Sequence, residues 1–235
     1  MSEQESRAAP EREAPLIAEP ISGAALSAAG AKSIHDVPAA SLNNGSENAM
    51  LVFVDRAQEK VLLKVPNALG WRLHYGVQLA RSDAASSREE RWQEVVSEIL
   101  SPASASGMFL GAHPGLFHLA NARPAGAMLF TFKSATAAPM RVYVLEVPLA
   151  DCSAAAAALG GDVAAVAIGD VPYADMWADD VFWLPALLAD EGAYFEGHFV
   201  FDGGPGSVKN GGGPVVAHSY SLRDFRLEGL SEAQE

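Results

Sequence analysis

The segment DMWADDVFWLP, residues 175–185, places two adjacent carboxylates among the largest apolar rings of the chain. Asp179 and Asp180 lie between Trp177 and Trp183. Burial beside aromatic rings raises the pKa of a carboxyl group, and two close carboxyl groups resist double ionisation, so one can donate a hydrogen bond while the other accepts one. Adjacent residues of a helix do not face each other, so the residues alone favour a simpler interpretation. In that interpretation Asp179 caps a helix and Asp180 is a surface carboxylate.

Two further carboxylates, Glu94 and Glu98, are four residues apart in the segment SSREERWQEVVSEIL, residues 86–100. Apolar residues at helical spacing predict a helix here, and Ser86 or Ser87 can cap its start. Residues four apart lie on one face of a helix, so the two glutamates would lie next to each other on its surface. A solvated acidic face with no ligand is the simplest interpretation of this pair.

The other predicted elements would have to position these two groups of carboxylates. Strands are predicted in residues 49–65 as a hairpin, in 127–133 with 140–147, in 163–172, and in 194–202 with 215–222, and a second helix is predicted in 179–191. The order strands, helix, strands, helix, strands predicts an α/β (α+β) fold, a sandwich with a mixed sheet rather than a doubly wound parallel sheet. Residues 1–46, rich in Ala, Ser, Pro and Glu, are predicted to form a disordered tail, and residues 47–228 a single domain.

Composition argues against several classes of function. The 235-residue chain has a formal net charge of −13, so binding to long nucleic acid is not expected. Cys152 is the only cysteine, which excludes an intrachain disulfide. The N-terminus lacks the apolar core of a secretory signal, and the longest apolar run, residues 153–168, contains Asp162, so no membrane span is expected. We expect a monomer in the cytoplasm or another soluble intracellular compartment.

The segment VPYADMWADDVFWLPALL, residues 171–188, resembles the C-terminal part of Nudix hydrolases of the 8-oxo-dGTP diphosphatase type. Weaker likenesses spread over residues 48–225; they are MLVFV at 50–54, FTF at 130–132, MRVYV at 140–144, YFEGHFVFD at 194–202 and YSLRDF at 220–225. The resemblance implies a Nudix-like α/β/α sandwich with a mixed sheet. It also implies a purine nucleotide as the ligand.

The same resemblance implies a set of base-binding residues. They are Asp179, Asp180, Trp177, Phe130, Met140 and Trp71. The two aspartates would read the edge of the purine, Trp177 would stack on it, and the others would line the pocket. Ordinary core packing is the alternative for Trp177 and the pocket-lining residues, and it is the interpretation that we favour for Trp183. After Trp71, the base-contacting asparagine of the family is replaced by Arg72.

The family's Nudix box begins with glycine and ends in a helix of the form R-E-apolar-x-E-E-x-G, and this chain matches it only in part. Gly76 can serve as the opening glycine, and Glu94 and Glu98 keep two of the carboxylates. Gln93 stands in place of the arginine, Ser97 in place of another glutamate, and the closing glycine is absent. A second register, with Glu90 and Glu94 in these roles, fits the apolar pattern worse because it places Arg91 at a buried position.

The resemblance therefore implies a Mg²⁺-dependent pyrophosphohydrolase of purine nucleoside triphosphates, oxidised ones of the 8-oxo-dGTP kind, that releases the monophosphate and pyrophosphate. Glu94 and Glu98 would be the catalytic residues and hold the metal. The alternative is a catalytically impaired Nudix-fold protein that acts as a nucleotide-binding or scaffold subunit. Release of pyrophosphate or phosphate by the purified protein separates these two functions.

Overall fold

The computed structural model describes residues 47–67, 70–73, 75–79, 87–132, 140–192, 194–201 and 215–223. The strands are β1 (Glu47–Asp55), β2 (Lys60–Asn67), β3 (Gly70–Leu73), β4 (Tyr75–Leu79), β5 (Arg123–Phe132), β6 (Met140–Pro148), β7 (Val163–Ala167), β8 (Tyr194–Phe201) and β9 (Val215–Arg223). The helices are α1 (Arg88–Leu100), α2 (Ala105–Gly111), α3 (Cys152–Leu159) and α4 (Asp180–Ala189), with 3₁₀ turns at Leu119–Asn121, Ile168–Asp170 and Tyr173–Asp175. The predicted tail, residues 1–46, lies outside the described residues, so the domain boundaries remain a prediction.

The strands form one nine-stranded sheet in the order β3-β2-β1-β6-β5-β8-β9, with β4 paired to β1 and β7 paired to β2. The pairs β1–β6 and β5–β8 are parallel, and the other pairs are antiparallel. The predicted strand pairs in the hairpin, in the middle of the chain and at its end are all confirmed. Because both pairings occur, the sheet is mixed, as expected.

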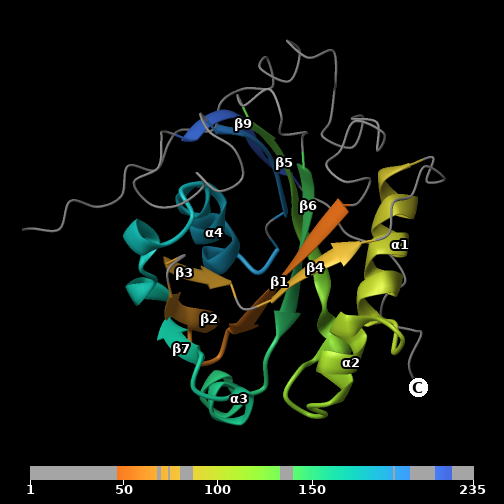
Figure 1. Ribbon diagram of the computed structural model, residues 1–235, viewed down its shortest axis with the longest axis vertical. Coiled ribbons are helices and arrows are strands. Elements are labelled where there is room, and N and C mark those ends of the chain that lie inside the picture. Colours follow the sequence, from red (N-terminus) through yellow and green to blue (C-terminus); the bar gives the residue numbers. More distant parts are fainter. Residues whose placement is uncertain are drawn as a thin grey trace, which may run out of the picture.

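Helices cover both faces of this sheet (Figure 1). One apolar core joins α1, α2 and α3 to one face, and a second core joins α4 to the other. The alternation along β1 shows this division, since Leu51 and Phe53 belong to the first core and Val52 and Val54 to the second. The predicted fold class, an α/β/α sandwich, is therefore confirmed.

The helix predicted in residues 86–100 forms as α1. The hydroxyl of Ser87 accepts a hydrogen bond from the backbone N–H of Glu90 at 3.1 Å, and this caps the first turn. The helix α2 lies in a stretch for which neither a helix nor a strand is predicted, because its glycines weaken the helical pattern. Its start is capped by Ser104, which accepts from the N–H of Gly107 at 2.9 Å. Within the described residues, no helix is long and apolar enough to cross a membrane.

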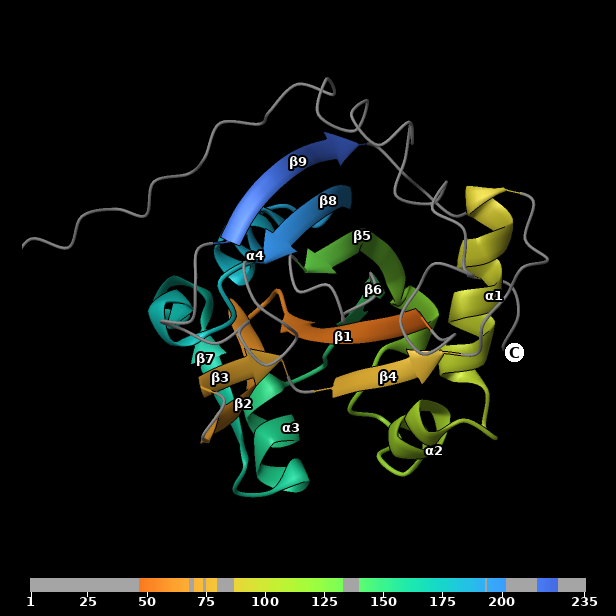
Figure 2. The same cartoon turned by 45° about the horizontal axis from the view of Figure 1, so that its top comes forward.

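The two strands of the first hairpin separate after two residue pairs, and another segment fills the gap. β1 pairs with β2 only at Val54 and Asp55, while its first half, 47–51, pairs with β4. The segment 70–79 thus pairs with β2 through β3 and with β1 through β4. Figure 2 shows β4 alongside β1, with its far end beside α1. The sheet is therefore split where β1 changes partner.

Candidate functional site

The paired aspartates lie at the start of α4, and neither is at the surface. Asp179 and Asp180 are both buried. The indole Nε1 of Trp183 donates to Asp179 Oδ2 at 3.2 Å, and the backbone N–H of Trp177 donates to Asp180 Oδ2 at 3.2 Å. Asp179 occupies the cap position, but its side chain caps no backbone N–H. The interpretation favoured by the residues alone, a cap and a surface carboxylate, is therefore wrong.

Burial raises the pKa values of both carboxyl groups. It raises the pKa of Asp179 to about 6. Burial and, in second place, the charge of Asp179 raise the pKa of Asp180 well above its ordinary value. Burial therefore favours the neutral form of both carboxyl groups, and that of Asp180 more strongly. Within the described part of the chain, Asp179 Oδ1 is buried without a hydrogen-bond partner, so ionisation of this carboxyl group is costly.

This arrangement predicts that Asp179→Asn stabilises the protein above pH 6. The folded-state pKa of about 6 lies above the ordinary 3.8, so the folded protein binds more protons than the unfolded chain between these values. The free energy of unfolding of the parent therefore falls as the pH rises through this window, and asparagine removes that loss while keeping an oxygen for Trp183. Urea unfolding at pH 4 to 7 measures the difference, with Asp175→Asn, an exposed neighbour, as the control. Parallel pH profiles of Asp179→Asn and the parent would contradict the buried charge.

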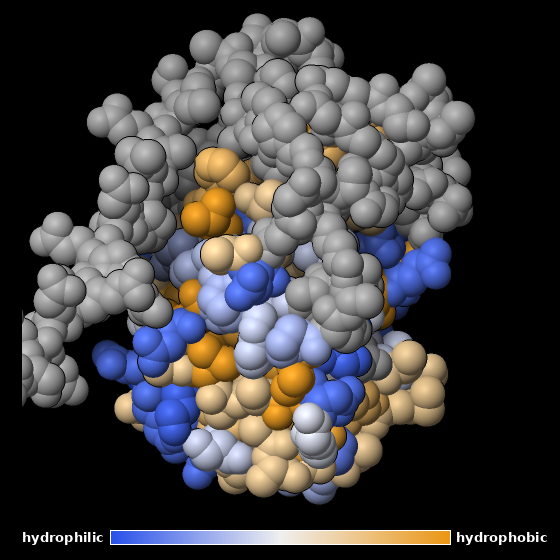
Figure 3. Space-filling view, turned by 60° about the vertical axis from the view of Figure 1, so that its left-hand side comes forward, coloured by the Kyte–Doolittle hydropathy of each residue, from blue (hydrophilic) through white to orange (hydrophobic). Residues whose placement is uncertain are grey.

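A cavity of about 500 Å³ opens beside this pair. The described residues that line it are Met50, Lys64, Arg72, Leu73, Gly76, Trp177 and Asp180. They come from β1, β2, β3 and β4 and from the segment that leads into α4, so the cavity lies where the sheet is split. Its volume is within the range of small-molecule sites in proteins. Figure 3 shows the side of the molecule with α4, β3 and β7, where apolar and hydrophilic residues are interspersed in the described part.

The structure brings some of the predicted base-binding residues to this cavity and leaves others outside its lining. Trp177 and Asp180 line it, whereas Asp179 is buried and is not among the described lining residues. Phe130 is fully buried in the core on the α4 face, with its ring centroid 5.4 Å from that of Phe201. Met140 and Trp71 are half-buried against the same core.

Trp183 lies in the core, as expected. Its ring stacks on Phe195 with a centroid distance of 5.0 Å and an interplanar angle of 19°. The same indole holds Asp179 through its N–H group. Trp183 therefore holds Asp179 in place and is not among the described residues that line the cavity.

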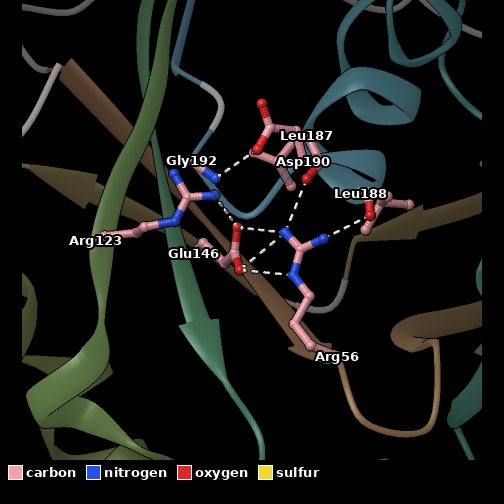
Figure 4. A network of polar contacts seen from close by, with 7 residues as sticks. All are labelled: Arg56, Arg123, Glu146, Leu187, Leu188, Asp190 and Gly192. Carbon is pink, nitrogen blue, oxygen red and sulfur yellow. Dashed lines mark hydrogen bonds and ion pairs between the residues drawn. The ribbon is translucent and has the colours of Figure 1, made fainter. Parts of the chain in front are cut away.

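The far end of α4 is fixed by an ion-pair cluster that the sequence did not reveal (Figure 4). The guanidinium of Arg56, in the turn between β1 and β2, donates to the carbonyl oxygens of Leu187 at 2.8 Å and Leu188 at 2.5 Å. It also pairs with Glu146 at 2.9 Å, which Arg123 contacts at 2.6 Å. A cation at a helix C-terminus is favourable because it meets unpaired carbonyl groups. The cluster fixes α4, and hence the aspartates at its start, relative to the sheet.

The two predicted metal ligands lie on α1, on the opposite face of the sheet. Glu94 and Glu98 are half-buried, and Glu94 Oε2 accepts from Arg91 Nη1 at 2.8 Å. Among the described residues, no three His, Cys, Asp or Glu side chains lie close enough to hold a metal ion together. The pair fits a common kind of Mg²⁺ site, in which the protein supplies one or two carboxylates. The remaining ligands of such a site are phosphate oxygens and water molecules. The structure places Glu94 in an ion pair, which weakens its charge toward a metal.

Arg91 is buried, and this removes the objection to the second register of the Nudix box. Its guanidinium pairs with Glu47 at the start of β1, which also pairs with Arg141 of β6. A buried guanidinium is tolerated when carboxylates pair with it. The apolar pattern therefore does not discriminate between Glu90 and Glu98 as the partner of Glu94.

Comparisons with known proteins give likenesses in structure but no match in sequence. No family model matches the chain, and no curated protein matches it. Among solved structures, the fold is similar to that of the mutator MutT protein from Bacillus halodurans, with a TM-score of 0.41 and 15% sequence identity. The similarity covers 75% of this chain and 97% of that protein.

Proposed function

We propose that the protein binds a purine nucleotide in the cavity beside Asp180 and Trp177. We further propose that it is a Mg²⁺-dependent hydrolase of purine nucleoside triphosphates, in particular oxidised ones of the 8-oxo-dGTP kind, that releases the monophosphate and pyrophosphate. The buried aspartate pair beside the cavity is the observation that carries this proposal. Carboxyl groups with strongly raised pKa values in a cavity are typical of functional sites.

The two aspartates have different roles in recognising the ligand. Asp180 lines the cavity and, as the protonated member, donates a hydrogen bond to an acceptor on the purine. Burial and, in second place, the negative charge of Asp179 favour the protonated form of Asp180. A base edge with a donor at this point leaves a buried polar group unpaired, which costs roughly 1–3 kcal/mol, or about ten- to hundredfold in affinity. Trp177 stacks on the ring, an interaction that tolerates different bases.

The phosphates would reach α1 by way of the edge strand β4. Gly76 of β4 lines the cavity, and β4 packs against α1 (Figure 2). Among the described strands, β4 pairs only with β1, so no further strand separates it from α1. When bound, Mg²⁺ neutralises the phosphate charge and polarises the bond that breaks. Glu94 and Glu98 would hold the metal, with Arg91 orienting Glu94.

The proposal predicts that turnover depends on the α1 carboxylates. Glu94→Gln combined with Glu98→Gln should lower the kcat/KM of nucleoside triphosphate hydrolysis by at least about tenfold, since each change removes a metal ligand. Pyrophosphate release with and without Mg²⁺ measures this, and Glu89→Gln, an exposed change on the same helix, is the control. Undiminished hydrolysis in the double variant would mean that other carboxylates hold the metal.

A second candidate function is nucleotide binding without turnover. The ion pair between Glu94 and the buried Arg91 favours it, because a carboxylate already paired is a weaker metal ligand. In this case the nucleotide binds in calorimetric titration, and no pyrophosphate or phosphate is released with Mg²⁺. The two functions share the cavity and differ only in the role of α1.

A further inference from the structure

Two cations line the same cavity as Asp180, and they are neighbours across two paired strands. Lys64 of β2 and Arg72 of β3 are directly opposite in the register. Like charges placed directly opposite each other in a sheet destabilise it. The chain has a net charge of −13 and so does not lack carboxylates. A pair of cations at this point is therefore unfavourable in itself, and an anion placed beside both of them would relieve the repulsion.

Arg72 also has an unsatisfied donor. Its Nε is buried and has no hydrogen-bond partner among the described residues. A buried N–H without an acceptor is costly, and a guanidinium has five donors and no acceptor. The group that completes this site must therefore present an acceptor. A phosphate fits, because it offers several oxygens to the planar fork of arginine.

Lys64 is weakly held by the protein. Its Nζ lies 3.8 Å from Asp162 Oδ2, and the Asp162 side chain is 71% exposed. An exposed pair at this distance contributes little, so the ammonium group can turn to a ligand. The carboxyl group among the described lining residues, Asp180, has its pKa raised well above its ordinary value, chiefly by burial, and this disfavours the charged form that would neutralise the two cations.

We propose that Arg72 and Lys64 form an anion subsite in the cavity that holds a phosphate group of the ligand. The inference deepens the proposed function. That the ligand contains a purine rests on the proposed function, whereas the phosphate is inferred from Arg72 and Lys64 alone. The phosphate can be the first group of the 5′ chain or a phosphate on the ribose hydroxyls. In either case the positive wall selects phosphorylated ligands over free nucleosides.

Calorimetric titration of the parent, Arg72→Gln and Lys64→Gln with four probes tests the subsite. The probes are guanosine, its 5′-monophosphate, its 3′-monophosphate and inorganic pyrophosphate. Each substitution should weaken the binding of at least one monophosphate and of pyrophosphate by about tenfold, since a hydrogen bond to a charged group is lost. Guanosine should bind all three proteins alike. The monophosphate that loses affinity identifies the position of the phosphate.

Two controls separate the subsite from general charge and from folding. Lys60→Gln removes a cation from the same strand outside the described lining of the cavity and should leave all affinities unchanged. Arg72→Lys keeps the charge and loses the planar fork, so its affinity should fall between those of the parent and Arg72→Gln. Without ligand, Arg72→Gln should unfold at the same temperature as the parent or higher, because it removes the like-charge pair.

The outcomes distinguish this inference from the proposed function. If guanosine does not bind but pyrophosphate binds and weakens with Arg72→Gln, the subsite stands and the purine assignment fails. If the nucleotides bind and Arg72→Gln weakens guanosine as much as its monophosphates, the subsite is wrong and the purine assignment stands. The subsite is also wrong if Lys60→Gln has the same effect as Arg72→Gln, or if no phosphorylated probe binds.

Discussion

Replacing Glu47 with glutamine is expected to lower the free energy of unfolding by about 3–5 kcal/mol, because it leaves two buried cations without their shared counter-ion. Glu47 is fully buried, and the side chains of its partners Arg91 and Arg141 are 7% and 5% exposed. Arg91 Nε donates to Glu47 Oε2 at 2.8 Å, and Arg141 contacts Oε1. Glutamine has nearly the same volume, so the loss reports the charge and not a cavity.

Chemical denaturation at neutral pH measures this loss, and Glu94→Gln is the matched control. Glu94 contacts the same Arg91, but its side chain is 39% exposed, so removing its charge should cost less than about 1 kcal/mol. A loss of similar size in the two variants would show that burial does not set the strength of these pairs. The comparison also tells whether a drop in turnover of Glu94→Gln reflects chemistry or folding.

Gly76→Val is expected to block the cavity without harming the fold. A side-chain carbon at Gly76 would have no heavy atom within 4 Å, and its backbone is not in the left-handed region. Gly76 is directly opposite Met50, which also lines the cavity, so the new side chain shares its face. A ligand that fills this space would meet overpacking of roughly 1–3 kcal/mol, which is about ten- to hundredfold in affinity.

Stability and binding should therefore respond in opposite directions to Gly76→Val. Valine suits a strand better than glycine, so the thermal unfolding temperature should stay equal or rise. Gly161→Val, in a turn with equal free space and outside the described cavity lining, is the control and should leave nucleotide affinity unchanged. Unchanged affinity in Gly76→Val as well would place the ligand elsewhere.

Elements whose pattern is local were predictable from the sequence. The spacing of Trp92, Val95, Val96 and Ile99 predicted α1, and all four are buried on one face. The strands with alternating or apolar runs were found for the same reason. In contrast, α2 was missed because Gly107 and Gly111 weaken its pattern. β3 and β4 were missed because each is a short run, and β4 pairs with β1, which is not its neighbour in the sequence.

Buried charge was the property that the sequence predicted least well. From the residues alone, Asp180 was predicted at the surface and a buried position of Arg91 was disfavoured. Both predictions considered a single charged residue, because the sequence does not show which residues pair with it. Glu47 lies 44 residues from Arg91, and no local pattern joins them. A signal did exist for Glu146, which interrupts the apolar strand MRVYVLEV and therefore requires a buried counter-ion. The cavity cations Lys64 and Arg72 carried no comparable signal, since strand pairing alone brings them together.

The division of the molecule into two cores has a consequence for how its sequence can change. The aspartates belong to the α4 face and the α1 glutamates to the other, and the apolar residues of the two faces form separate clusters. Substitutions without shared partners act almost independently on stability. A lineage carrying this fold could therefore lose or regain the α1 carboxylates by neutral drift while selection maintained the ligand cavity, so one ancestor can give rise both to an enzyme and to a sensor of the same metabolite.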